Sequence, residues 1–295
     1  KYKGTIDVII AGPPCQGFSQ KGKRLSLDDP RNFLFQQFVR FVAAFKPKYF
    51  VLENVPNIIT TSNGYFKEQI IQEFGKLGYE VCSGVLCAAD FGVPQDRRRA
   101  VFIGQLGKLE VKLPEPNGRK TTVRDAIYDL PFIASGEGQE ESKYDKAPLS
   151  EFQKALRGNA STLYNHTATK HSKAAIEKLK LIPKGKGKEV LPEHLLTKSI
   201  YSGTWSRLLE DSIAPTITTR FDTPSSGRFT HPILHRCLTV REAARIQSFP
   251  DSFIFYGSRG SQMKQVGNAV PPMLAYAIAN VIVENEKINN YESAS

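Results

Sequence analysis

The spacing of hydrophobic and polar positions changes twice along the chain, and the first stretch is the most regular. Over residues 1–106, four short apolar runs predict buried strands, at residues 5–10, 48–52, 79–88 and 99–106. Two segments between them carry apolar stripes at helical spacing: Leu34, Phe38, Phe41, Val42 and Phe45, then Phe66, Ile70, Phe74 and Leu77. This order predicts an α/β fold, a mostly parallel sheet with helices on both faces.

The second stretch, residues 107–236, has poor periodicity and is punctuated by Gly, Ser, Thr, Pro and Lys, which predicts a smaller, irregular domain. Regular spacing returns in residues 237–295. Residues 239–242 have the pattern of a capping box that opens a helix, and Pro271-Pro272 open a last amphipathic helix. We therefore expect a core in 1–106, a separate domain in 107–236, and in 237–295 a hinge helix and a C-terminal helix that returns to the core.

Composition adds a charge and argues against a membrane span. The 295 residues include 40 Lys and Arg against 29 Asp and Glu, a net charge of +11, which favours a polyanionic partner although soluble enzymes can be equally basic. The four cysteines form no Cys-x-x-Cys pair, so we expect no metal site, no disulfide framework and a reducing location, the cytoplasm. The longest apolar runs, 38–45 and 275–283, are too short or too interrupted to span a bilayer.

One cysteine stands out by its position. Cys15 follows the first predicted strand in the sequence Ala-Gly-Pro-Pro-Cys-Gln-Gly-Phe-Ser, where two consecutive prolines stiffen the turn. The carboxyl end of a central strand is where open α/β sheets bind ligands, so the thiol is a candidate nucleophile. Taken alone, a free cysteine is more often a small buried hydrophobic residue.

Three further groups each have a plain and a functional interpretation. Glu53 ends the second strand, at the same sheet edge as Cys15 if the two strands are parallel, although alone it could cap a helix. The run from Gln95 to Arg99 places three guanidinium groups at a strand entrance, although alone it could be a solvated charge run. Residues 265–272 predict a tight turn before the last helix, and alone they are only a loop.

Taken together and in this order, these groups resemble the DNA (cytosine-5) methyltransferase family. The matches are Pro-Pro-Cys-Gln, Glu-Asn-Val, Gln-x-Arg-x-Arg, the stretch 241–250, and the closing Gly-Asn-x-Val-Pro. The resemblance implies a Rossmann-like methyltransferase core with a target-recognition domain in 107–236. It also implies S-adenosylmethionine as methyl donor, no metal, double-stranded DNA as substrate, and flipping of the target cytosine out of the duplex. A bacterial restriction-modification or orphan methyltransferase is expected.

The resemblance assigns roles residue by residue. Cys15 is expected to attack C6 of cytosine, Glu53 to hold or protonate N3, and Arg99 to hydrogen-bond O2, while Arg97 braces the site. The methyl-donor contacts that carry over are Pro14, Leu34 and Asn268. The candidate DNA contacts are Gln16, Ser19, Lys21, Lys23, Arg24, Arg207, Thr218, Arg220 and Arg228.

The chain departs from the family's pattern at its start. The Phe-x-Gly-x-Gly motif that cradles the methyl donor is absent, as are the next acidic positions, and two such strand-helix units account for on the order of 60–80 residues. We therefore expect a truncated chain, or a split enzyme completed by a second polypeptide, with an open sheet edge. Two alternatives remain: a tRNA cytosine-C5 methyltransferase of the same fold, and a DNA-binding remnant or subunit without catalysis.

Overall fold

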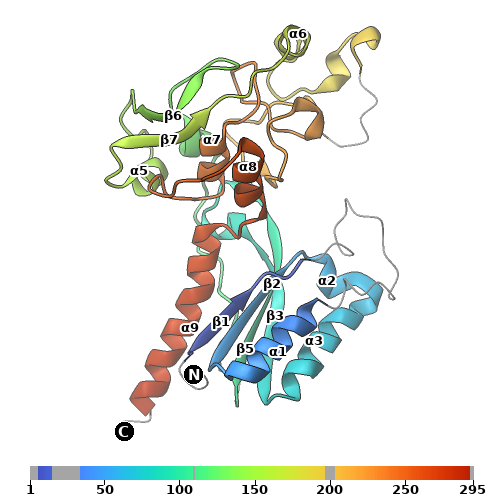
Figure 1. The fold of residues 1–295 in the computed structure, drawn as a ribbon, viewed down its shortest axis with the longest axis vertical. Coiled ribbons are helices and arrows are strands. Elements are labelled where there is room, and N and C mark those ends of the chain that lie inside the picture. Colours follow the sequence, from blue (N-terminus) through green and yellow to red (C-terminus); the bar gives the residue numbers. More distant parts are fainter. Residues whose placement is uncertain (1–5, 15–33, 109, 197–202, 293–295) are drawn as a thin grey trace. The chain divides into compact units, whose positions relative to one another are not determined.

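A computed structural model describes residues 6–14, 34–108, 110–196 and 203–292 of the protein (Figure 1). The chain divides into two compact units. Unit 1 comprises Lys1–Cys87, Arg98–Pro116 and Tyr276–Ser295, and unit 2 comprises Ala88–Arg97 and Asn117–Ala275. Residues 88–97 therefore belong with the second unit, although they are flanked in sequence by strands of the first. Whether unit 2 is the target-recognition domain stays a prediction.

Unit 1 is built on a four-stranded sheet in the order β1-β2-β5-β3. Its strands are β1 (Val8–Ala11), β2 (Tyr49–Asn54), β3 (Tyr79–Cys87) and β5 (Arg98–Leu106). β1 is parallel to β2, while β5 is antiparallel to both β2 and β3, so β1, β2 and β3 share one direction. The reversed strand has a simple cause. Residues 88–97 contain no α-helix, and a parallel neighbour would need a long crossover connection, usually helical.

Helices cover both faces of this sheet. They are α1 (Phe35–Phe45), α2 (Asn57–Thr60), α3 (Tyr65–Gly75) and most of α9 (Pro272–Glu292). The Phe50 ring packs edge-on against Phe38 of α1 and stacks on Phe74 of α3, with centroids 5.8 and 3.9 Å apart. Successive strand residues point to opposite faces, and the Tyr49 hydroxyl donates to Glu286 of α9 at 2.9 Å. Figure 1 shows α9 on the far side of the sheet from α1 and α3. The predicted α/β fold with helices on both faces is confirmed, but the sheet is mixed rather than mostly parallel, because β5 is antiparallel to both of its neighbours.

Unit 2 consists of short elements joined by long irregular stretches. They are β4 (Gln95–Asp96), α4 (Val123–Ile127), β6 (Gly138–Lys143), α5 (Glu151–Arg157), β7 (Thr162–Thr167), α6 (Lys173–Leu181), β8 (Ala214–Pro215), α7 (Val240–Ile246) and α8 (Arg259–Asn268). β4 pairs with β8 in parallel and β6 with β7 in antiparallel register. Single 3-10 turns lie at Thr61–Gly64 in unit 1 and at Ala88–Phe91, Lys188–Val190, Glu193–Leu195 and Pro224–Ser226 in unit 2. A core cluster joins α4, α5, α7 and α8.

The start of α7 confirms the predicted capping box. The Thr239 hydroxyl accepts from the Glu242 amide at 3.1 Å, and the Glu242 carboxylate accepts from the Thr239 amide at 2.8 Å. Glu242 also pairs with both terminal nitrogens of Arg236, at 2.7 and 2.8 Å. Burial alone would raise the pKa of Glu242, but the Arg236 guanidinium outweighs burial and holds this pKa below its usual range.

Every residue of α7 is buried, including its charged ones. Arg245 donates to Asp129 and Asp251 at 2.7 and 2.6 Å, and Arg241 donates to the Phe253 carbonyl at 2.8 Å. Removing one partner of a buried ion pair typically costs about 3–5 kcal/mol, because the other charge is left uncompensated. The charged residues of the 241–250 stretch therefore organise the interior of unit 2.

The end of α8 corrects one prediction. Residues 265–268 form its last turn rather than a tight turn, and only residues 269–271 are non-helical before α9. Val270 precedes a proline and is disfavoured in the helical region, which ends α8. α9 begins at Pro272, as the proline pair predicts. Within the described ranges no single helix is long and apolar enough to cross a membrane, although α8 and most of α9 pass that test as a bent pair.

Candidate active site

The carboxyl ends of β1 and β2 lie side by side, because the two strands are parallel neighbours. β1 leads into Gly12, Pro13 and Pro14, and β2 ends in Glu53 and Asn54. The Asn54 side chain joins the two ends, since its Nδ2 donates to the Pro13 carbonyl at 3.3 Å. Asn54 is buried. The proline turn is therefore fixed to β2 from inside the protein.

β5 brings an arginine to this edge of the sheet. Glu53 lies opposite Val101 in the antiparallel register, and Arg99 stands two residues earlier in β5. Arg99 Nε is 2.7 Å from Glu53 Oε1, and the two side chains are only 13% and 18% exposed. Arg99 Nη1 also donates to the Arg98 carbonyl at 2.7 Å. Charges this enclosed are screened less than surface charges. The pair offers a carboxylate and a fork of donors where α/β sheets bind ligands.

Gly12 leaves room for the Glu53 carboxylate. A Cβ at residue 12 would lie 3.2 Å from Glu53 Oε2, so a larger residue would press on the carboxylate. The chain then passes through Pro13 and Pro14 to Cys15. Cys15 lies outside the described residues, as do the predicted DNA contacts Gln16, Ser19, Lys21, Lys23 and Arg24. Their roles stay predictions.

Arg97 does not lie where a catalytic residue could act. Its side chain is fully buried within unit 2. The guanidinium donates to the Ile217 carbonyl at 3.0 Å and to the Gly267 carbonyl at 2.8 Å. A guanidinium enclosed by the protein's own carbonyls cannot reach a substrate base. In the structure Arg97 joins two backbone segments that are distant in the chain, and its predicted role of bracing the catalytic site stays a prediction.

Gln95 is a buried residue to which the sequence assigned no role, although it begins the Gln-x-Arg-x-Arg motif. Its Oε1 accepts from the Ile217 amide at 2.8 Å, and its Nε2 donates to Gln247 Oε1 at 2.9 Å. Gln95 and Arg97 are two residues apart in an extended segment, and both bind the backbone of Ile217. The spacing of two residues was the signal that could have predicted a shared role, because alternate residues of a strand point the same way.

The three predicted methyl-donor contacts are divided between the two compact units. Pro14 is exposed at the end of the proline turn, and Leu34 is half-buried at the start of α1, both in unit 1. Asn268 is exposed at the end of α8 in unit 2. These residues offer apolar contacts and one amide, but none is a carboxylate that could bind the ribose hydroxyls or the ammonium group of S-adenosylmethionine. Their role in binding the methyl donor stays a prediction. The described residues hold no metal-binding group of three or more His, Cys, Asp or Glu.

Arg207 corrects another prediction. It is 4% exposed, and its guanidinium donates inward, to four backbone carbonyls and one histidine nitrogen. Burial lowers its pKa. A side chain held in this way is part of the core of unit 2 and does not contact DNA.

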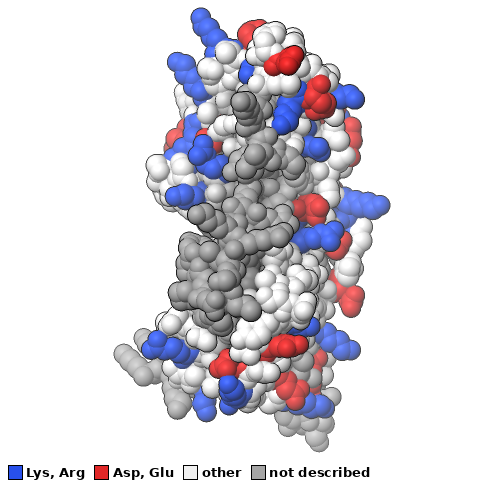
Figure 2. All heavy atoms as spheres, turned by 90° about the vertical axis from the view of Figure 1, so that its right-hand side faces the viewer, with Lys and Arg blue, Asp and Glu red and all other residues white. Residues whose placement is uncertain are grey.

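The other predicted contacts in unit 2 stay available to a ligand. Arg220 and Arg228 are exposed, and Thr218 is half-buried. Arg220 forms a loose ion pair with Asp222, at 3.7 Å. Figure 2 shows the Lys and Arg side chains of the described residues scattered among Asp and Glu on the face it presents. On that face the described residues form no single broad basic patch. The predicted DNA contact therefore rests on individual side chains rather than on a charged surface.

The sheet, its helices and the site at its strand ends define the Rossmann-like methyltransferase class. A putative DNA modification methyltransferase encoded within an E. coli prophage has the same fold, with a TM-score of 0.73 and 29% identity over 95% of this chain and 79% of that one. The family model "C-5 cytosine-specific DNA methylase" matches residues 1–284. The chain belongs to this family.

Two curated relatives agree with this assignment. The chain is 41% identical to the Type II methyltransferase M.DdeI of Desulfomicrobium norvegicum, over 94% of this chain and 72% of that protein. It is 40% identical to the Type II methyltransferase M1.HphI of Haemophilus parahaemolyticus, over 95% of this chain and 68% of that protein. The protein is therefore a DNA (cytosine-5) methyltransferase, and its family uses S-adenosylmethionine as a general property.

Proposed function

We propose that the enzyme transfers a methyl group from S-adenosylmethionine to C5 of a cytosine in a specific duplex DNA sequence, with Cys15 as the covalent nucleophile. One observation carries this proposal. The Glu53–Arg99 pair, with 2.7 Å between its charged groups, lies beside the proline turn that leads to Cys15. The relatives of this chain, M.DdeI and M1.HphI, are Type II methyltransferases, which supports a bacterial, cytoplasmic restriction-modification setting.

The chemistry explains why these residue types are needed. C5 of cytosine is a poor nucleophile until the Cys15 thiolate adds to C6 and makes the ring an enamine. Negative charge then builds at O2 and N3, where Arg99 donates a hydrogen bond and Glu53 holds or supplies a proton. Preorganised groups of this kind contribute about 3–4 kcal/mol each in a dry site. S-adenosylmethionine supplies the methyl group. Loss of the C5 proton and expulsion of Cys15 then restore the aromatic ring and the free thiol.

Access to C6 requires the cytosine to leave the base stack, since enzymes that act on a base extrude it from the duplex. The exposed side chains of Arg220 and Arg228, with Thr218, are the described candidates for holding the DNA. Lysine and arginine contacts to phosphate position the duplex but carry no sequence information. The target sequence depends on contacts to base edges.

The substrate is tested by offering two nucleic acids. The complete enzyme, which includes the further segment proposed below, is incubated with labelled S-adenosylmethionine and with either duplex DNA or tRNA, and methyl incorporation is measured. We expect incorporation into DNA alone, with none into a duplex already methylated at C5 of the target cytosine. Transfer to tRNA alone would establish the tRNA-directed alternative. Transfer to neither would favour a DNA-binding subunit without catalysis.

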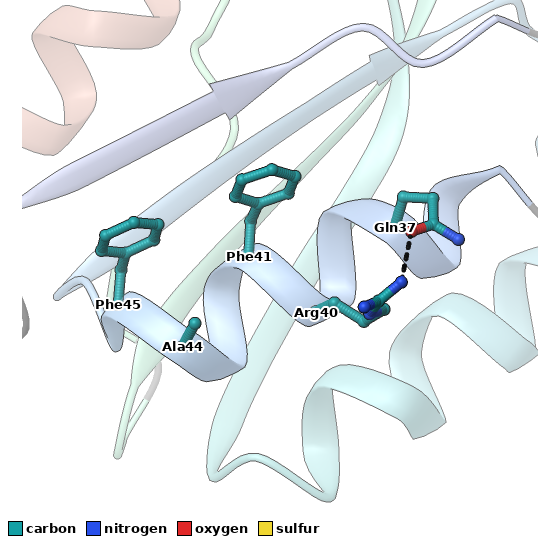
Figure 3. Close-up of a pocket in the computed structure, with 5 residues that line it drawn as sticks. All are labelled: Gln37, Arg40, Phe41, Ala44 and Phe45. Carbon is teal, nitrogen blue, oxygen red and sulfur yellow. Dashed lines mark hydrogen bonds between the residues drawn. The ribbon is translucent and has the colours of Figure 1, made fainter.

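We also propose that a further segment, on this chain or on a second polypeptide, covers the β1 edge and completes the methyl-donor site. Among the described residues β1 pairs only with β2, and Ile10 is 76% exposed. On α1, Phe41 is 59% exposed, so the buried stripe of this helix is narrower than predicted. Figure 3 shows Phe41 and Phe45 projecting from the same side of α1. Together with Gln37, Arg40 and Ala44 they line a hollow of about 330 Å³.

These apolar groups fit a protein surface that something else covers. The Phe41 and Phe45 rings stack with centroids 6.4 Å apart. A strand edge that no other described strand pairs with, close to an exposed aromatic ring, is an aggregation hazard unless another segment covers it.

Calorimetric titration of S-adenosylmethionine into the 295-residue chain tests this second proposal. We expect a dissociation constant weaker than about 1 mM, because the residues present supply only part of the site. Micromolar binding would contradict the proposal, since it would mean that the donor site is already complete.

A further inference from the structure

We propose that Gln95, Arg97 and Gly267 are positioning residues, which hold the segment 215–220 where it contacts duplex DNA. The inference rests on the proposed DNA contacts at Thr218 and Arg220 and goes beyond them. It assigns their placement to three buried residues that need not touch the DNA.

The segment 215–220 starts from a very short strand pair. β8 pairs with β4 at only two positions, Gln95 opposite Ala214 and Asp96 opposite Pro215. Side chains then continue the pairing where the strands end. The Ile217 amide donates to Gln95 Oε1 at 2.8 Å, and the Ile217 carbonyl accepts from Arg97 Nη1 at 3.0 Å. Both backbone groups of Ile217 are thus satisfied by side chains of one extended segment.

Gly267 fixes the next residue by close approach. A Cβ at residue 267 would lie 2.5 Å from both the carbonyl carbon and the carbonyl oxygen of Thr218. The last turn of α8 therefore packs directly on the Thr218 backbone. Arg97 links the two contacts, because its Nη2 donates to the Gly267 carbonyl at 2.8 Å. A single guanidinium sets the distance between α8 and the segment.

The orientation of the Gln95 amide is also determined. Gln247 Nε2 donates to the Val266 carbonyl at 2.8 Å, so its Oε1 is turned toward Gln95 and accepts from Gln95 Nε2. Gln95 Oε1 must then face the Ile217 amide. A carboxylate at residue 95 would have the same shape but could not donate to Gln247.

One end of the segment is held in the core while the other end is exposed, and this contrast favours a role in binding DNA. Ile217 is fully buried, while Thr218 is half-buried and Arg220 is exposed. Burying a guanidinium is costly, and a well-packed apolar residue often serves stability equally well. Arg97 supplies what an apolar residue cannot, a directional hold on two carbonyls. Such a hold is useful where a neighbouring side chain must meet a ligand at a defined place.

A matched pair of glycine substitutions in α8 tests the proposal in the active enzyme. Gly267→Ala must displace the Thr218 backbone, whereas Gly260→Ala meets nothing within 4 Å. We expect Gly267→Ala to raise KM for DNA by about tenfold, since small misplacements of a binding group have effects of this size or larger. It should also make binding less sensitive to salt, with kcat at saturating DNA and KM for S-adenosylmethionine unchanged. Gly260→Ala should match the wild type in both KM values, in kcat and in the salt dependence of DNA binding.

Gln95→Glu supplies a second variant should Gly267→Ala fail to fold, and we expect the same rise in KM for DNA. Arg220→Ala separates the two proposals, because losing one phosphate contact reduces the slope of log affinity against log salt by about one. If Arg220→Ala leaves that slope unchanged, the proposed DNA contact is wrong. If Arg220→Ala weakens binding but Gly267→Ala and Gln95→Glu lower only the melting temperature, the contact holds and the positioning role is overturned.

Discussion

Replacing Cys15 by Ala is expected to abolish methyl transfer while leaving DNA binding within a few-fold of the wild type. Without the thiolate nothing adds to C6, and the ring stays too electron-poor at C5 to accept a methyl group. Loss of an enzyme's nucleophile costs on the order of 10⁴-fold or more in rate. The measurement is release of tritium from C5 of labelled cytosine in duplex DNA. A duplex with 5-fluorocytosine at the target should give a stable covalent adduct with the wild type and none with Cys15→Ala.

Cys82→Ala is the matched control. Cys82 is half-buried in β3, and burial raises the pKa of its thiol, which disfavours a reactive thiolate. This variant should release tritium at the wild-type rate. Tritium release by Cys15→Ala at even a tenth of the wild-type rate would contradict the covalent mechanism, and loss of activity in Cys82→Ala would move the nucleophile elsewhere.

The second large effect is expected at Glu53. Glu53→Gln keeps the shape of the side chain and a hydrogen-bond acceptor for Arg99, but it removes the charge and the capacity to carry a proton to N3. We expect kcat to fall by about 10²–10³-fold, as it does when one group aimed at developing charge is lost. Single-turnover methylation of duplex DNA measures this directly, and binding to the same duplex should change little.

A surface ion pair in unit 1 provides the comparison. Glu73 of α3 lies 2.6 Å from Lys76, and the two side chains are 30% and 68% exposed. Glu73→Gln should leave single-turnover methylation unchanged. Arg99→Lys should lower kcat as well, since a lysine cannot reproduce the fork of donors. The double variant Glu53→Gln with Arg99→Lys should lose less than the product of the two single losses, because the residues touch. A Glu53→Gln enzyme within threefold of wild type would remove this carboxylate from the mechanism.

The strands of unit 1 were predictable because each is a short apolar run with clear limits. The reversed direction of β5 was missed in the prediction of a mostly parallel sheet, although the ten residues 88–97 are too few for a crossover helix. The stripe of α1 was predicted too wide. Phe41 lies at the edge of the helical stripe, and spacing alone does not say whether another segment covers that edge.

The arginines could not be assigned from sequence. Arg97 and Arg207 have the same residue type as Arg220, yet the first two are buried and the third is exposed. Their burial depends on carbonyl groups distant in the chain, 120 and 170 residues away for Arg97. No local pattern shows which guanidinium will find such acceptors. Motifs rich in charge therefore indicate a site but do not separate the residues that contact a ligand from those that hold the fold.

The hold on the segment 215–220 has a consequence for how sequence specificity can change. Gln95 and Arg97 bind the amide and the carbonyl of Ile217, and Gly267 packs on the backbone of Thr218. Backbone atoms are the same in every residue, so these contacts do not depend on which side chains the segment carries. Evolution or protein engineering can therefore substitute the side chains at residues 218–220 while these backbone contacts stay in place. DNA recognition can thereby diverge without refolding the unit that presents it.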